Sequence, residues 1–381
     1  MTPSRCAGPS MRLGAGFTII EFMIAMTLSL LVLAALTTAF VASSRSRAEI
    51  EKANEQIENG RFALQILTDD IEMAGFLSSF DIDLALAADT PLPVPAAKPN
   101  PCSAALADLR DAMPLHILGY DSLAALDSDL DDCLADLKPG TDILVVRRTA
   151  TCVMNDPNCA PIAGAPYFQA SLCETQLESL DASEYFRLDT TVGNLNRTQR
   201  NCATVADRRQ YLVHIYFIAN EDQAGDGIPT LKRAELGNAA NAGGFTIVPL
   251  AHGIQDLQVD YGVDNDADGA PDTFTSDPDI YDAPGGAAGP HADCAAHASE
   301  CISNWRNVMA VRLNVLARNS SVSRDHTDAK VYLLGRNDDG TDRCALDADD
   351  DGTCEAFGDA FKRHVYQTSV RLNNPSGRRE S

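Results

Sequence analysis

The chain has 381 residues and is strongly acidic, with 54 Asp and Glu against 30 Lys and Arg and a formal net charge of -24. Hydrophobic residues make up 45% and charged residues 22%, a composition that is typical of a folded protein and excludes a wholly disordered or collagen-like chain. The net negative charge argues against a general role in binding nucleic-acid phosphate or anionic lipid.

Near the N-terminus, a run of 26 residues carries a single charge. Residues 17–42 read FTIIEFMIAMTLSLLVLAALTTAFVA, and Glu21 is the one ionisable side chain among them. As a helix, the run is roughly 39 Å long at ~1.5 Å per residue, enough to cross a hydrocarbon core of about 30 Å. The sequence therefore predicts one membrane span at 17–42.

The residues in front of this run bear on how the chain is processed. A secretory signal would be cut at a small-residue site such as residues 39–43, whereas a signal anchor would stay uncut. Here a basic leader ends at Gly16, the apolar run begins at once with Phe17, and its fifth residue is Glu21. A lone carboxylate inside a bilayer is costly and usually marks a function.

The segment GFTIIE, from Gly16 to Glu21, resembles the junction of a class III prepilin. This resemblance implies that a prepilin peptidase removes the leader 1–16 by cutting between Gly16 and Phe17, and that Phe17 becomes the methylated N-terminus. It further implies that Glu21 accepts the terminal ammonium of a neighbouring subunit during assembly.

Beyond residue 42 the chain turns polar but keeps a helical spacing of apolar residues. The pattern predicts that the helix continues through 43–76, ends near Met73 before Gly75, and packs its second half under a globular domain at 77–381. The apolar positions are Ile50, Ala53, Ile57, Leu64, Leu67, Ile71 and Ala74.

Residues 60–76, GRFALQILTDDIEMAGF, resemble the end of the long helix in the PilW family of type IV pilus minor pilins, which has the form GRxALxxLxxDIxxAGF. Residues 225–236 and 253–272 resemble the central part of the same family, and Trp305 and the closing VYQTSVRLNNP fit its pattern. A segment at about 81–210 matches poorly and is interpreted as a variable insert.

Seven segments have the β-branched, alternating composition of strands: 142–148, 211–219, 245–250, 254–263, 308–317, 330–334 and 365–372. An acidic stretch at 121–136 has leucines at helical spacing and predicts a short helix. One long helix followed by many strands predicts an α+β fold of the type IV pilin kind, with the helix packed on a mainly antiparallel β-sheet.

Ten of the eleven cysteines follow the leader, and export places them in an oxidising compartment where disulfides are the default. Sequence alone does not fix their connectivity. Short gaps favour Cys152–Cys159, Cys294–Cys301 and Cys344–Cys354, which leaves Cys102–Cys133 and Cys173–Cys202 by elimination. A zinc site of His291, Cys294, His297 and Cys301 is an alternative, although its spacing is unusual for structural zinc.

Two acidic loops have carboxylates at positions one, three, five and nine around a glycine, the order in which a loop can fold around calcium. Neither loop has the Glu at position twelve of a complete EF-hand, so solvated acidic turns are the alternative. We expect calcium as the one cofactor. The ligands would be Asp264, Asp266, Asp268 and Asp272 in the first loop, and Asp347, Asp349, Asp351 and Glu355 in the second.

The sequence contains no G-x-S-x-G, H-E-x-x-H or phosphate-binding Gly-rich motif, so we do not expect an enzyme. The resemblance implies a PilW-like minor pilin, anchored by one span in the inner membrane with a periplasmic domain, and later part of an extracellular pilus. Its role would lie in assembly initiation or the tip complex.

The expected partners are other minor pilins, the major pilin, the prepilin peptidase, the inner-membrane assembly platform and a tip adhesin. No nucleic acid is expected. Two alternatives stay open. One is a J-type minor pseudopilin of a type II secretion system, which shares the leader, helix and sheet. The other is a membrane-anchored calcium-binding adhesion domain.

Overall fold

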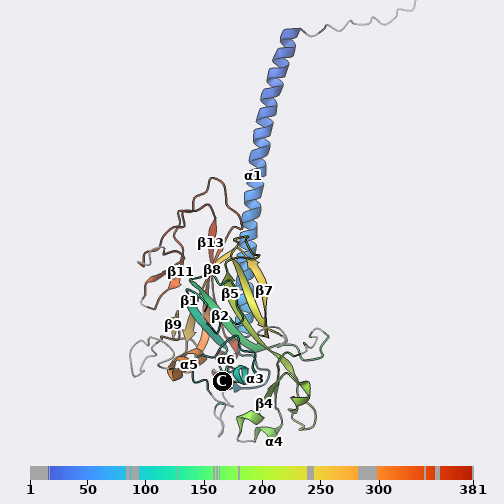
Figure 1. The fold of residues 1–381 in the computed structure, drawn as a ribbon, viewed down its shortest axis with the longest axis vertical. Coiled ribbons are helices and arrows are strands. Elements are labelled where there is room, and N and C mark those ends of the chain that lie inside the picture. The colour runs from blue at the N-terminus through green and yellow to red at the C-terminus, as the bar shows by residue number, and fades with distance from the viewer. Residues whose placement is uncertain are drawn as a thin grey trace, which may run out of the picture. The chain divides into compact units, whose positions relative to one another are not determined.

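The computed structural model describes residues 16, 18–82, 86, 94–126, 128–157, 159, 162, 164–178, 181–237, 244–281, 298–338, 340–347 and 352–379. By its internal contacts the chain divides into two units, Met1–Ala53 and Asn54–Ser381. One helix, α1 (Ile19–Glu72), begins in the first unit and ends in the second (Figure 1). Its bounds agree closely with the predicted helix.

In the first unit, the apolar side chains of α1 have no protein around them. Large hydrophobic residues from Ile19 to Val41 are all exposed by 40% or more. Among the described residues, α1 is the one helix long and apolar enough to cross a membrane. This agrees with the span predicted from the sequence.

The second unit contains two larger antiparallel sheets and a separate hairpin (Figure 1). The first sheet has the order β1-β2-β5-β3-β4, and β6 and β7 extend it from β5. Its strands are β1 (Ile117–Leu123), β2 (Thr141–Thr149), β3 (Tyr167–Ala170), β4 (Phe186–Asp189), β5 (Arg209–Ala219), β6 (Thr230–Leu236) and β7 (Phe245–His252).

The second sheet has the order β13-β10-β8-β9, and the hairpin pairs β11 with β12. These strands are β8 (Ile254–Val263), β9 (Thr273–Thr275), β10 (Val308–Arg318), β11 (Leu333–Arg336), β12 (Asp342–Cys344) and β13 (Arg363–Arg371). Short helices lie before, between and after the strands: α3 (Leu106–Asp111), α4 (Glu174–Leu177), α5 (Ala298–Arg306) and α6 (Asn373–Arg379).

The lower part of α1 packs on the globular domain through a face that differs from the predicted apolar one. Ile57, predicted to be inward, is 45% exposed. The buried positions recur every three or four residues and include two polar side chains, and they are Gln56, Gly60, Ala63, Leu67, Asp70 and Ile71.

Close contacts explain why this face carries glycine and glutamine. The Tyr366 ring on β13 occupies the space where a Cβ at Gly60 would stand, so the missing side chain lets helix and strand approach each other. The Gln56 side-chain amide donates to the carbonyls of Ala317 (2.8 Å) and Lys362 (3.0 Å). The helix is therefore held by hydrogen bonds as well as by apolar packing.

Two predictions from the sequence were wrong. The described residues of 121–136 form no helix, because Leu123 pairs with Thr141 in β1 while Leu130 and Leu134 enter the core from a loop. The strand predicted at 330–334 lies later, as β11 from Leu333. In both places apolar residues are buried as predicted, but tertiary packing determines the backbone conformation.

Strand β8 is buried along its whole length, so its polar side chains are removed from water. The Asp256 carboxylate is 5% exposed and accepts a hydrogen bond from the Gln258 side chain at 3.1 Å. Burial raises the pKa of Asp256 to about 6, although the charge of Lys138 and the Gln258 hydrogen bond oppose the shift. The folded state therefore holds a proton here more tightly than the unfolded chain does.

This raised pKa predicts a pH-dependent effect of Asp256→Asn. Because the folded pKa lies above the unfolded value of 3.8, the stability contributed by the protonated form is full below pH 3.8 and is lost as pH rises toward 6. We expect Asp256→Asn to raise the free energy of unfolding above pH 6, by about 2–3 kcal/mol, and to change it little near pH 3. Denaturant unfolding across this pH range tests it; an equal effect at all pH values would contradict it.

Candidate functional site

The first turn of α1 brings together the residues that flank the predicted processing site. Phe17 itself lies outside the described residues, while Gly16 and Thr18 are exposed. The backbone N–H and the hydroxyl of Thr18 donate to the Glu21 carboxylate at 2.9 and 3.0 Å, and the Glu21 N–H donates to the Thr18 hydroxyl at 3.3 Å. This reciprocal pair is a capping box. Glu21 thus closes the start of its own helix, and its role between subunits stays a prediction.

At the other end of the helix, Asp70 joins α1 to the larger sheet. Its carboxylate accepts hydrogen bonds from Arg148 Nε on β2 at 2.6 Å and from the Tyr216 hydroxyl on β5 at 2.8 Å. His214 Nδ1, also on β5, lies 2.7 Å from the same carboxylate. Asp70 is only 4% exposed. One buried carboxylate therefore connects the helix to two neighbouring strands.

The surroundings keep Asp70 charged. Burial is the largest single influence and by itself would raise the pKa of Asp70, but hydrogen bonds and charges from His214 and Arg148 together lower it well below its usual range. Burial and the neighbouring Asp70 charge raise the pKa of Tyr216, so its hydroxyl remains a donor. Sequence analysis gave Asp70 no role, although it is the D of the form GRxALxxLxxDIxxAGF and lies on the buried face, three residues after Leu67.

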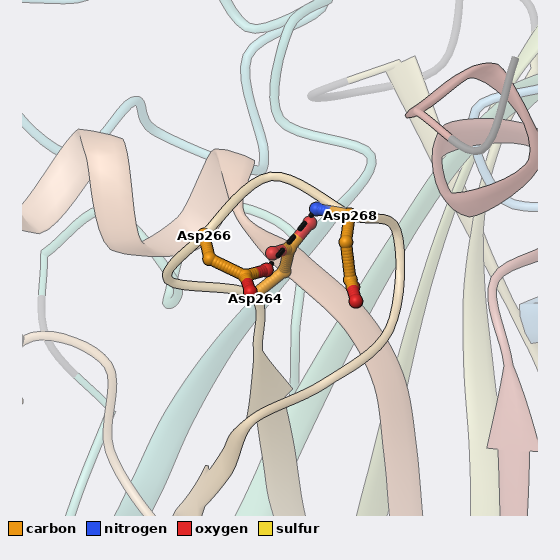
Figure 2. A group of neighbouring side chains, drawn as sticks. All are labelled: Asp264, Asp266 and Asp268. Atoms are coloured by element: carbon orange, nitrogen blue, oxygen red, sulfur yellow. Dashed lines mark hydrogen bonds between the residues drawn. The ribbon is translucent and has the colours of Figure 1, made fainter.

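The first acidic loop follows β8 and brings three of its four predicted ligands together (Figure 2). One ligand oxygen from each of Asp264, Asp266 and Asp268 lies within 4.8 Å of the others. Asp272 is directed to the Asn265 N–H instead, at 2.8 Å. The three carboxylates could contribute ligands to one hard cation.

The buried member of this group already has partners. Asp264 accepts hydrogen bonds from the backbone N–H of Ala267 (2.7 Å) and Gly269 (3.0 Å) and from Arg379 Nη1 (2.9 Å). Burial raises the pKa of Asp264, but these hydrogen bonds outweigh it and lower the pKa overall. A cation would have to share Asp264 with the Arg379 guanidinium, which weakens any binding.

Helix α6 connects this loop to the end of α1. Besides Arg379, its Arg378 donates to the carbonyls of Gly75 (3.3 Å) and Phe80 (3.1 Å), and its Asn374 donates to the Ala74 carbonyl (3.1 Å). The C-terminal helix thus binds backbone carbonyls of the segment that follows α1.

The second acidic loop is described in part. Asp347 accepts a hydrogen bond from the Gly352 N–H at 2.9 Å, as a turn would require. Asp349 and Asp351 lie outside the described residues, and Glu355 follows the loop. The predicted ligand set here stays a prediction.

Four cysteine pairs lie at disulfide distance, and they are the pairs that the short gaps and elimination predicted: Cys102–Cys133, Cys152–Cys159, Cys173–Cys202 and Cys344–Cys354. Cys301 is also disulfide-bonded, while its predicted partner Cys294 lies outside the described residues with His291 and His297. A disulfide sulfur has no thiolate to offer, which argues against the zinc alternative.

Comparison with known families adds to this geometry. Residues 215–374 match the family model PilW, described as Type IV Pilus-assembly protein W. This match supports a PilW-family type IV pilus protein. The PilW match runs from β5 to α6 and includes the first acidic loop, whereas α1 and the segment 81–210 lie before it. Comparisons with curated proteins and with solved structures gave no match.

Removing the Asp70 charge tests its structural role. Asp70→Asn leaves Arg148 in a half-buried position without its carboxylate, so we expect a loss of about 3–5 kcal/mol in the free energy of unfolding at pH 7. The neighbouring Asp69→Asn is the control, because Asp69 is exposed and should change stability by no more than about 0.5 kcal/mol. Denaturation of the full chain in detergent measures both; equal effects would contradict the role.

Calcium binding by the first loop also has a direct test. We expect binding with a dissociation constant on the order of 10⁻⁴–10⁻³ M, as in extracellular calcium modules, and one fewer bound ion in Asp266→Asn/Asp268→Asn. The control, Asp131→Asn/Asp132→Asn, removes two exposed carboxylates from another acidic turn. Isothermal titration calorimetry counts the ions; unchanged stoichiometry in the first variant would exclude this loop.

Proposed function

We propose that the chain is a minor pilin of the PilW type that takes part in the initiation of type IV pilus assembly or in the complex at the pilus tip. The observation that carries the proposal is the PilW match over 215–374, in a chain that also begins with one long apolar helix. We further propose that it is inserted in the inner membrane, cut after Gly16, methylated on Phe17, and then built into the pilus.

The exposed helix supports an assembly role. Apolar side chains from Ile19 to Val41 are unburied in the single chain, so lipid or neighbouring helices must cover them. On transfer from the bilayer into a filament, these side chains would pack against the helices of other subunits. Glu21 would then accept the terminal ammonium of an adjacent subunit, which offsets the cost of burying the carboxylate and sets the axial register.

Within the second unit, the C-terminal part of α1 is joined to the strands of the globular domain. Asp70, Gln56 and the close approach at Gly60 all join α1 to strands of the globular domain. Partners proposed for that domain are other minor pilins, the major pilin and a tip adhesin. The prepilin peptidase and the inner-membrane platform would act on the helical part.

The secretion pseudopilin shares the helix and the sheet, but the matched family is a pilus one, which favours the pilus. A membrane-anchored calcium-binding domain would account for the acidic loop in Figure 2 but not for the PilW match. Calcium bound by this loop would stabilise the domain of a minor pilin, and its binding is compatible with the assembly role.

Substitution of Glu21 tests the proposed assembly step. We expect Glu21→Ala to leave membrane insertion intact, because removal of a charge favours the bilayer, but to reduce incorporation into surface pili about tenfold or more. Thr27→Ala is the control, since the Thr27 hydroxyl bonds only backbone carbonyls of its own helix. Immunoblots of sheared pili and of membranes report the two quantities; normal amounts of Glu21→Ala chain in pili would refute the step.

A further inference from the structure

Lys98 and Asp279 form an ion pair between two segments that lie far apart in the sequence. Lys98 Nζ lies 2.6 Å from Asp279 Oδ2, and the two residues are separated by 181 positions. Lys98 precedes α3, in the segment before the family match, whereas Asp279 follows β9 inside the match. The exposed fractions of the two side chains are 15% and 18%. A largely buried amine thus touches a largely buried carboxylate.

Aromatic rings keep most water away from the amine. Lys98 Nζ lies 3.9 Å from the centroid of the Tyr120 ring and 5.3 Å from that of Trp305, which is only 1% exposed. Burial and the nearby Asp279 charge raise the pKa of the neighbouring Asp277 to about 6, against the opposing charge of Lys98. These surroundings reduce the advantage that water gives to an ammonium and a carboxylate over the neutral amine and acid.

Further hydrogen bonds fix the orientation of the two groups. The second carboxylate oxygen, Asp279 Oδ1, accepts a hydrogen bond from Trp305 Nε1 at 2.5 Å. Lys98 Nζ also donates to the Gly119 carbonyl at 2.6 Å. A fixed N–H donor at Oδ1 stabilises the negative charge that develops on this oxygen when a nitrogen adds to the carboxyl carbon. Both hydrogen bonds are of a kind that an amide could keep, because its oxygen accepts and its N–H donates.

Contact between the groups also removes most of the entropic barrier to a reaction between them. Well-oriented groups in one molecule react as if each were present at an effective concentration on the order of 10⁵–10⁸ M. The buried ion pairs Arg343–Asp260 and Arg363–Asp328 do not have the same chemistry open to them, because a guanidinium stays protonated and does not act as a nucleophile. An amine does so once it has lost one proton.

We propose that Lys98 and Asp279 condense in the folded chain to form an isopeptide bond. One proton moves from Nζ to Oδ2 along the existing hydrogen bond, and the free electron pair of Nζ then attacks Cγ of Asp279. Nζ gives a second proton to Oδ2, the Cγ–Oδ2 bond breaks, and Oδ2 leaves as water. One ammonium and one carboxylate become one amide and one water, so the step needs no oxidant, reductant or other reactant.

This bond would connect parts of the domain that the described disulfides do not connect. The disulfides whose two cysteines are both described span 7 to 31 residues, and each lies wholly within the insert or wholly within the matched region. A bond between Lys98 and Asp279 would span 181 residues and join the two regions. It would hold the insert on the domain when the contacts around it open locally. The inference does not rest on the proposed function.

Mass spectrometry of the full chain, extracted from membranes in detergent, tests the bond. After reduction of the disulfides, proteolysis should release a branched peptide that joins Lys98 to Asp279 and is lighter by one water than the sum of its two parts. We expect most of the unmodified chain to carry this peptide. Lys98→Arg keeps the positive charge but cannot condense, so its chain should carry none.

Lys52→Arg is the matched control, because Lys52 pairs with Glu49 at 3.2 Å in a more exposed position and its loss should leave the branched peptide unchanged. Recovery of Lys98 and Asp279 only in separate peptides of the unmodified chain would overturn the inference, whether or not a variant folds. A branched peptide of the same mass loss that persists in Lys98→Arg would also overturn it. The amount of the chain in sheared pili, which tests the proposed function, is a separate measurement.

Discussion

The attachment of α1 to the larger sheet depends on one buried carboxylate. The Asp70 side chain accepts hydrogen bonds from Arg148 and Tyr216. Because the carboxylate is buried, breaking either contact is costly. Arg148 belongs to β2, in the segment before the family match, whereas Tyr216 belongs to β5, inside it. The same residue therefore connects the helix, the variable insert and the PilW-matched domain. A separate close contact, between Gly60 and Tyr366 of β13, joins the helix to the smaller sheet.

The C-terminal helix adds a second set of contacts near the end of α1. Arg378 binds the Gly75 carbonyl, while Arg379 binds Asp264 in the acidic loop. The loop, the chain end and the helix end are thus joined by hydrogen bonds, and a cation held by the loop would compete with Arg379.

Much of the fold could be predicted because apolar periodicity reports burial. It gave the bounds of α1 closely, and the β-branched runs around Val145, Ile215 and Val259 became β2, β5 and β8. Periodicity gave a wrong prediction at Leu130, which packs into the core from a loop. Leucines at helical spacing do not distinguish a helix from a turn that is held by the Cys102–Cys133 disulfide. It also passed over Asp70, because a polar residue on an apolar face becomes meaningful only when its partners from distant strands are known. Of the predicted metal ligands, the loop brought three together because their spacing is local.

The account as a whole depends on a chain that keeps its apolar helix as a mature N-terminus. The most direct test is mass spectrometry of the N-terminal peptide of the protein extracted from membranes and from sheared pili. The account predicts a chain that starts at N-methylated Phe17 in both fractions. An intact Met1, or a start near Ala42 with the apolar helix removed, would contradict it.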